Sequence, residues 1–163
     1  MEERIAALLG VVHEEIRLYR DLIEHARHKT ALLVRGCTDQ ILELHKVEET
    51  YSIQLRILES EISRLCSEIC QALRIPRKEF TLLKLAEGAE PSVAEEIRAQ
   101  TSLFRTLVAQ LSSVNRRNMR LAESSLRYSR GMLDLLAGAT GSYQGTGKLR
   151  ALPAIPATIS HQA

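Results

Sequence analysis

Large aromatic side chains are scarce in this sequence: Trp is absent, and only two Phe and four Tyr occur among 163 residues. A hydrophobic core must therefore be filled mainly by Leu, Ile, Val and Ala. Such side chains suit helix-on-helix packing, where many small knobs mesh, better than a thick globular core. The apolar share of 45% is enough to cover one face of several helices in one domain of ordinary size.

Cysteine and long apolar runs are scarce as well. Three cysteines are too few and too scattered for a disulfide framework. No run of about 18 apolar residues is available to span a bilayer, so we expect no membrane insertion. The acidic first residues lack the form of a signal peptide. We therefore expect a cytoplasmic protein with reduced thiols.

The spacing of apolar residues predicts three long helices, at about 2–33, 39–74 and 92–137, because their seams alternate steps of four and three. The first seam is Ile5, Leu9, Val12, Ile16, Tyr19, Ile23, Ala26, Thr30 and Leu33. The second is Ile41, Leu44, Glu48, Tyr51, Leu55, Leu58, Ile62, Leu65, Ile69 and Ala72, where only Glu48 is charged. The third is Val93, Ile97, Gln100, Phe104, Leu107, Leu111, Val114, Asn118, Leu121, Ser125, Tyr128, Met132 and Leu135.

Short breaks between these segments predict the connections. Gly36 can end the first helix in the left-handed conformation, and Thr38 or Asp39 can cap the second. So short a link folds the second helix back antiparallel to the first. A packed short helix is expected at about 79–86, and glycine-rich residues 138–163 are expected to form a flexible tail. The prediction is an all-α, coiled-coil-like three-helix bundle: an antiparallel long-helix hairpin, a longer third helix and a disordered C-terminal tail, with 1–137 as a single helical domain.

No set of residues points to catalysis, a metal or a cofactor. Cys66 and Cys70 share a helix face, but a structural zinc site needs about four ligands, so small packing residues are the better interpretation. His25 and His28 near a helix end are expected to be solvated and to favour the helix dipole. We expect a protein that is not an enzyme.

Charge is unevenly distributed along the chain. Residues 1–75 carry a net charge of −3 and residues 76–163 a net charge of +5. Much of the excess is a basic stretch, which comprises Arg116, Arg117, Arg120, Arg127 and Arg130. It is interpreted as a solvated face or as a surface that helps to hold an acidic partner. Nucleic-acid binding is not expected, because it would usually bring more charge and groove-reading residues.

Two polar residues, Asn118 and Ser125, occupy seam positions of the third helix. A buried Asn in a coiled-coil seam sets register at some cost in stability. The alternative is that this part of the helix is open and forms a groove-filling face for a partner helix. The candidate binding residues are Asn118, Leu121, Ser125, Leu126, Tyr128, Met132, Leu133, Leu135 and Leu136.

The segment Val114-Asn115-Arg116-Arg117-Asn118, followed by Leu121, Ser125-Leu126, Leu133 and Leu136, resembles the C-terminal helix of the FlgN family of bacterial flagellar export chaperones. The first 75 residues also resemble that family's N-terminal hairpin, including the turn Leu32-Leu33-Val34-Arg35-Gly36. The tail Ser142-Tyr143-Gln144-Gly145-Thr146-Gly147 matches the family's Tyr-Gly-x-x-Gly form at Tyr143 and Gly147, with Gln144 where Gly is common.

The resemblance implies a function. Proteins of this family bind the C-terminal helices of the hook-associated proteins FlgK and FlgL, prevent premature assembly and deliver them to the flagellar type III export gate. The third helix would then bind the client, and Tyr143 with Gly147 would dock to the export-gate protein FlhA. The sustained seams are equally typical of a structural coiled-coil homodimer or scaffold, which is the alternative hypothesis.

Overall fold

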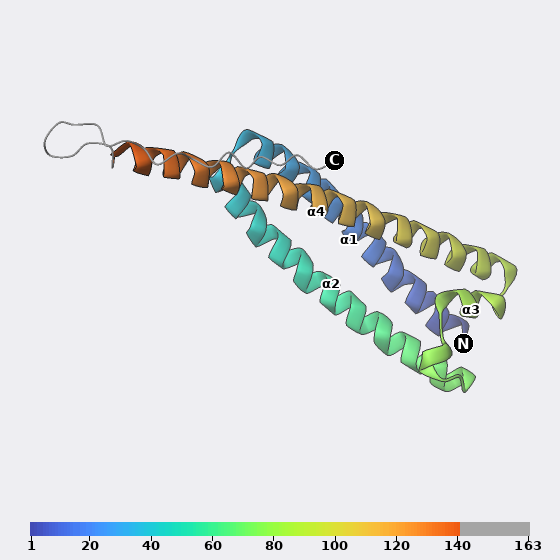
Figure 1. Ribbon diagram of the computed structural model, residues 1–163. Helices are drawn as coiled ribbons and strands as arrows, with labels where there is room; N and C mark the ends of the chain where they lie inside the picture. Colours follow the sequence, from blue (N-terminus) through green and yellow to red (C-terminus); the bar gives the residue numbers. More distant parts are fainter. Residues whose placement is uncertain (141–163) are drawn as a thin grey trace, which may run out of the picture. The chain divides into compact units, whose positions relative to one another are not determined.

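Residues 1–140, the part of the chain that the computed structural model describes, are all-α and contain no strand. The elements are α1 (Glu2–Arg35), α2 (Thr38–Leu73), the 3₁₀ turn η1 (Arg77–Glu79), α3 (Leu82–Glu87) and α4 (Pro91–Thr140) (Figure 1). Side chains are described for residues 1–137. The predicted fold class is confirmed: α1 and α2 form the long-helix hairpin, and the 50 residues of α4 exceed the 34 of α1 and the 36 of α2.

The hairpin turn is built around Gly36, which has a φ of 69°. Its N–H donates to the Leu33 carbonyl at 3.3 Å, and the Cys37 N–H donates to the Leu32 carbonyl at 3.1 Å. These two bonds are those of a Schellman motif, which favours glycine in the left-handed position. The capping prediction was wrong, because α2 begins at Thr38 and Cys37 makes no side-chain cap bond. The turn leaves Cys37 as the single residue between Gly36 and the next helix.

The connection between α2 and α4 is packed, as predicted, but its short helix begins later. Thr81 is the N-cap of α3, and its hydroxyl accepts a bond from the Lys84 N–H at 3.1 Å. The chain before Thr81 forms η1 instead of joining the α-helix. Phe80 and Leu85 are buried in the main core, which explains why this segment is too apolar for a solvated loop.

Helix α1 is buried over a wider face than its predicted seam. It packs against α2 through the hairpin and against α4, where the Tyr19 and Phe104 rings meet edge to face at 5.0 Å between centroids. Its buried side chains are Ile5, Leu8, Leu9, Val12, Glu15, Ile16, Leu18, Ile23, Ala26 and Leu32. Two packing partners require two adjacent apolar rows, so a single seam underestimates the core of this helix.

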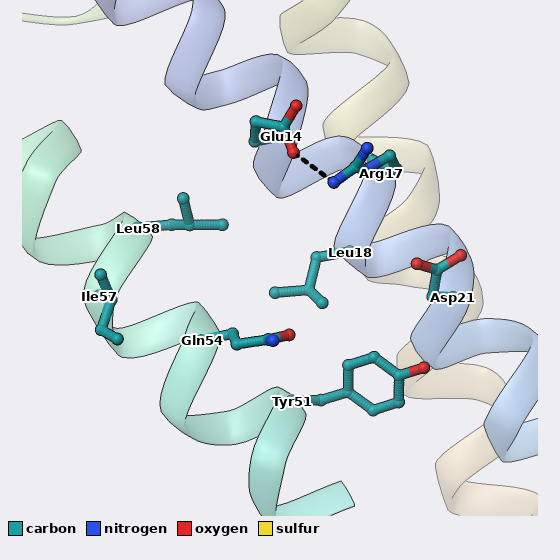
Figure 2. A pocket seen from close by; sticks show the side chains of 8 residues that line it. All are labelled: Glu14, Arg17, Leu18, Asp21, Tyr51, Gln54, Ile57 and Leu58. Carbon is teal, nitrogen blue, oxygen red and sulfur yellow. Dashed lines mark ion pairs between the residues drawn. The ribbon is translucent and has the colours of Figure 1, made fainter. Parts of the chain in front are cut away.

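Helix α2 is buried mainly near its C-terminal end. Its buried residues are Leu65, Cys66, Ile69 and Cys70, and the seam residues from Ile41 to Ile62 are at most half-buried. A hollow of about 500 Å³ separates the middle of α2 from α1, with Leu18 and Tyr51 among its lining residues (Figure 2). The sequence predicted one continuous seam for α2, whereas close packing is confined to one end.

The chain divides into two compact units, at Ala122 and Glu123 within α4. Unit 1 contains the hairpin, the connection and α4 as far as Ala122. The described part of the second unit is the rest of α4, which ends at Thr140, three residues beyond the predicted end. The predicted flexible tail from residue 141 onward lies outside the described residues.

Candidate functional site

One face of α4 carries the same apolar repeat in two environments. Along the seam, Ile97 and Leu107 are buried and Leu121 is half-buried. From Ser125 onward the next seam residues, Tyr128 and Met132 among them, are exposed. The period of the seam does not change between the two stretches, although the seam residues of the first are packed and those from Ser125 to Leu135 are exposed.

The candidate binding residues from Leu121 onward form a surface that we call the distal apolar face: Leu121, Ser125, Leu126, Tyr128, Met132, Leu133, Leu135 and Leu136. Helical geometry at 100° per residue places these side chains on about half of the circumference of α4. Tyr128 is 72% exposed and Leu135 is 67% exposed. Large apolar side chains that are exposed together on one side of a helix are candidates for contact with a partner.

Four of the five arginines of the basic stretch lie away from this face. On the same helical wheel, Arg116, Arg120, Arg127 and Arg130 lie on the side opposite the distal apolar face. Arg117 falls outside this group. No ion pair joins any of the five to an acidic residue in the described part of the chain. The helix is therefore amphipathic, with one apolar side and one charged side that carries these four arginines together with Glu123 and Asp134.

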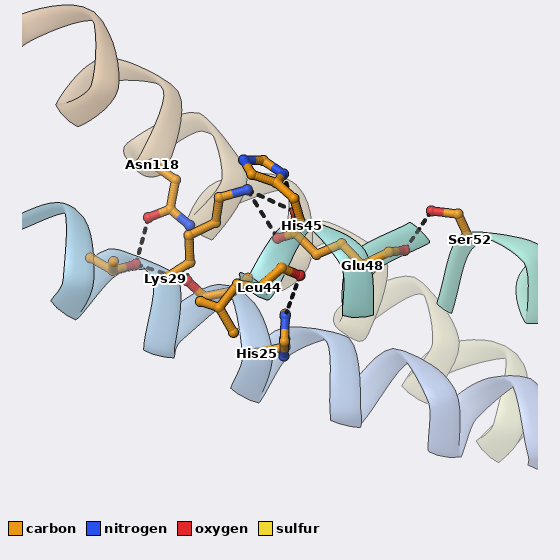
Figure 3. A network of polar contacts seen from close by, with 9 residues as sticks. His25, Lys29, Leu44, His45, Glu48, Ser52 and Asn118 are labelled. Atoms are coloured by element: carbon orange, nitrogen blue, oxygen red, sulfur yellow. Dashed lines mark hydrogen bonds and ion pairs between the residues drawn. The ribbon is translucent and has the colours of Figure 1, made fainter. Parts of the chain in front are cut away.

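Asn118 lies where the packed part of α4 ends, and it is buried with an exposed fraction of 5%. Its Nδ2 donates to the Ala26 carbonyl of α1 at 2.8 Å, and its Oδ1 accepts from the Thr30 hydroxyl at 2.6 Å (Figure 3). The Thr30 hydroxyl also lies 3.0 Å from the Ala26 carbonyl, but it has one proton, which we assign to the shorter contact with Asn118. Both ends of the amide are therefore satisfied by α1, which supports the register interpretation of this seam position.

A second polar contact joins α1 to α2 beside Asn118. The Lys29 ammonium donates to both carboxylate oxygens of Glu48, at 2.8 and 3.1 Å, and His45 Nδ1 lies 3.1 Å from the same carboxylate (Figure 3). The Lys29 and Glu48 side chains are 16% and 26% exposed. This half-buried pair explains why a charge interrupts the apolar seam of α2 at Glu48. We call Lys29, Thr30, Glu48 and Asn118 the polar layer.

Glu15 is the most unusual titratable group in the described part of the chain. Its side chain is buried on α1 with an exposed fraction of 6% and makes no ion pair. Burial, and secondly the nearby Glu59 carboxylate, raise the pKa of Glu15 to about 7. Burial and the same two carboxylates also raise the pKa of Tyr19. Glu15 does not line the hollow between α1 and the middle of α2.

Glu15 is not among the residues of the predicted seam, although the spacing of its neighbours indicates that it is buried. Leu8, Glu15 and Leu22 recur at intervals of seven residues beside the predicted seam, and the seam residues Val12 and Tyr19 lie between them at steps of four and three. A helix with two such rows packs against two partners, so position 15 should have been expected to be buried.

Cys66, Cys70 and His25 are packing groups in this fold. Cys66 and Cys70 are buried in the core, and burial raises the pKa of the Cys66 thiol, which disfavours the thiolate that a metal ion needs. Within residues 1–137, no group of three His, Cys, Asp or Glu side chains is placed to hold a metal ion. The solvated role expected of His25 was wrong: its Nε2 lies 3.2 Å from the Leu44 carbonyl, and its ring meets Tyr51 edge to face.

A comparison with protein-family models matches residues 1–151 to the model described as FlgN protein. The match covers both packed helices of the hairpin and all of α4. The chain belongs to the FlgN family. Membership in this family supports a general role as a flagellar export chaperone that binds flagellar proteins. No curated protein and no solved structure matches the chain.

The structure describes the residues of one predicted binding site and not those of the other. The distal apolar face of this FlgN-family chain is described, whereas Tyr143 and Gly147, which the resemblance assigns to export-gate docking, lie outside the described residues. In the described part of the chain, no helix has the length and apolar character needed to cross a membrane.

Proposed function

We propose that this chain is a cytoplasmic export chaperone that binds the C-terminal helices of the hook-associated proteins FlgK and FlgL through its distal apolar face. The observation that supports the proposal is the unbroken seam of α4, which is packed as far as Leu121 and exposed from Ser125. A client helix laid on this face would bury Leu, Met and Tyr side chains in a helix-in-groove contact. Covering the client's own apolar face would prevent its premature assembly.

In this proposal Asn118 has a positioning role. Its amide is already bonded to Ala26 and Thr30, so it fixes the register of α4 on α1. The surface available to a client then begins at Leu121. Ordering of the client helix on binding lowers the net affinity, which favours release at the export gate.

The test is a calorimetric titration of the full chain with purified C-terminal helical segments of FlgK and FlgL. Leu126→Asp and Met132→Asp each place a charge in the exposed apolar face, and we expect each to weaken binding by about 30-fold or more. Ser112→Asp is the control, because Ser112 is exposed on the same helix and does not belong to the distal apolar face. Normal client binding by Leu126→Asp and Met132→Asp would show that the face is wrongly assigned.

Delivery to the export gate is a separate part of the proposal. Tyr143 and Gly147 would contact FlhA after the client has bound. We expect Tyr143→Ala to keep its affinity for the FlgK segment and to lose binding of the chaperone–client complex to the cytoplasmic part of FlhA. A variant that binds FlhA as tightly as the unaltered chain would remove Tyr143 from this role.

The exposed seam also supports the alternative of a coiled-coil homodimer or scaffold, since two copies of the distal apolar face can cover each other. Sedimentation distinguishes the two functions. A chaperone gives a one-to-one complex with the client segment, whereas a scaffold gives a tight homodimer that the client segment does not alter.

A further inference from the structure

A groove of about 660 Å³ lies between the N-terminal turns of α1 and the N-terminal turns of α4, within unit 1. Its lining residues are Met1, Glu2, Ile5, Ala6, Leu9, Gly10, His13, Gly88, Ala89, Glu90, Val93, Glu96 and Gln100. We call this hollow the amino-terminal groove. None of these residues belongs to the distal apolar face or to the polar layer, so its function can be separated from client binding.

The floor of the amino-terminal groove is apolar and is formed partly by small residues. Ile5 and Leu9 are buried beneath it, and Ala6 and Ala89 present only methyl groups. A Cβ atom added at Gly10 would meet no atom within 4 Å, so open space lies over this position. Glycine inside a helix costs about 1 kcal/mol relative to alanine. At Gly10 the missing side chain leaves room for another backbone to approach closely.

The rim of the groove is acidic. Glu2, Glu90 and Glu96 border it, and no Lys or Arg side chain is among the lining residues. None of the three carboxylates forms an ion pair in the described part of the chain. The Gln100 Oε1 is buried without a hydrogen-bond donor, whereas its Nε2 donates to Glu96 at 3.1 Å. An occupant that fits this groove therefore brings positive charge and hydrogen-bond donors to an apolar contact.

The length of the groove indicates the form of the occupant. The lining runs from Glu2 to His13 on α1, and from Glu90, the residue before α4, to Gln100 on α4. Each stretch corresponds to about 15–17 Å of helix, or three turns. An extended peptide on this apolar floor would leave its backbone N–H and C=O groups unpaired, because two helices offer no strand edge. A helix satisfies its own backbone and packs between two ridges as a further helix of the bundle.

We propose that the amino-terminal groove binds a basic amphipathic helix of about three turns from another protein. The apolar side of that helix lies over Ile5, Leu9 and Val93, and its backbone approaches Gly10. Its Lys or Arg side chains pair with Glu2, Glu90 and Glu96. The groove gives the chain a second docking site, whose occupant differs in charge and in position from a client held on the distal apolar face.

The probe for this site is a fluorescent 14-residue helical peptide with Leu along one face and Lys on both flanks. Fluorescence anisotropy with the full chain should show binding that weakens as salt is added, because exposed charge pairs are screened. The control peptide carries Glu in place of every Lys and should bind at least tenfold more weakly. Equal binding of the two peptides, or no binding of the Lys peptide, would overturn the proposal.

Two substitutions with matched controls locate the binding. Glu96→Lys should weaken the Lys peptide about tenfold, whereas Glu95→Lys, on an exposed neighbour that does not line the groove, should change it less than twofold. Gly10→Leu fills the floor and should also weaken binding at least tenfold, while Ala7→Leu, exposed and outside the groove, should not. Because leucine favours helix more than glycine does, Gly10→Leu should remain folded. Equal effects of a test variant and its control would show that the peptide binds elsewhere.

A further pair of measurements separates this site from the proposed chaperone function. Leu126→Asp should lose the client segment and keep the Lys peptide, and Gly10→Leu should do the reverse. Loss of the Lys peptide in Leu126→Asp would overturn a distinct site, whatever happens to the client. Sedimentation of the chain alone tests whether a second copy of the chain occupies the groove. If the chain self-associates and Gly10→Leu abolishes this self-association, a second copy is the occupant and the inferred partner is wrong.

Discussion

Helix α4 repeats the same alternation of four- and three-residue steps over residues 93–121 and over residues 125–135, yet the first stretch is packed and the second is exposed. In the first stretch, Ile97 and Leu107 join the core formed with α1 and α2. In the second, the same side of the helix presents Tyr128 and Leu135 to solvent. The comparison shows that a regular seam specifies a face able to pack, whereas its partner is specified elsewhere in the chain.

The polar residues of the seam differ in the same way. Asn118 is buried, and its amide is bonded to two groups of α1. Ser125, seven residues later on the same face, is exposed. A polar group in a seam can fix the register of a helix only where a second helix supplies its hydrogen-bond partners. Asn118 meets this condition, and Ser125, at the equivalent seam position, does not.

The largest effect should come from shortening a leucine in each stretch. Leu107→Ala removes a buried side chain and should lower the free energy of unfolding by about 2–4 kcal/mol. Leu135→Ala, at the equivalent seam position of the exposed stretch, should change it by less than about 0.5 kcal/mol. Urea denaturation followed by circular dichroism measures both. Similar losses for the two variants would mean that residues 123–137 are covered in solution.

Removing the buried carboxyl group should alter the packed region in a pH-dependent manner. Because the folded state holds the proton of Glu15 to about pH 7, Glu15 contributes most stability below its ordinary pKa of about 4.5. That contribution falls as the pH rises from about 4.5 to 7 and then stays constant. We compare the free energy of unfolding of Glu15→Gln with that of the unaltered chain. Between pH 4 and pH 8 the difference should change by about 2–3 kcal/mol in favour of the variant.

Urea titrations at a series of pH values measure this difference. Glu14→Gln is the matched control, because Glu14 is exposed and pairs with Arg17 at the surface. A pH profile of Glu15→Gln that runs parallel to that of the unaltered chain would show that Glu15 ionises normally in the folded state.

Replacing the two polar seam residues should give a smaller contrast. Asn118→Ala loses the bonds to Ala26 and Thr30 and should cost about 1–2 kcal/mol of unfolding free energy. Ser125→Ala loses no bond to another helix and should be neutral within about 0.5 kcal/mol. Thermal unfolding of the two variants checks this pair. A neutral Asn118→Ala variant would contradict the register role.

The smallest effect should come from the two glycines inside the long helices. Gly10→Ala lies in unit 1 and should raise the free energy of global unfolding by up to about 1 kcal/mol, since alanine favours helix. Gly131→Ala lies in the second unit and should raise the local helix content without moving the global transition. Hydrogen exchange resolved by residue separates the two responses: equal shifts in the global transition would mean that the units unfold together.

The sequence by itself determined the helical architecture. Alternating steps of four and three located the three long helices, because the period of an α-helix is set by local backbone geometry. Gly36 fixed the hairpin turn for an equally local reason, since the left-handed conformation it adopts is strained for other residues. The resemblance of residues 114–136 to the C-terminal helix of the FlgN family was also available from the residues alone.

Only the tertiary structure decided which of the amphipathic faces are covered. The seams of α2 and α4 are as regular as that of α1, but the middle of α2 is thinly packed and α4 is exposed from Ser125. The tertiary structure also shows why a charged residue occupies the seam of α2, because Glu48 forms an ion pair with Lys29 of α1. It further shows that Glu15 is buried. Burial and cross-helix pairing depend on contacts between residues far apart in the chain, whereas periodicity reports only the face that each helix offers.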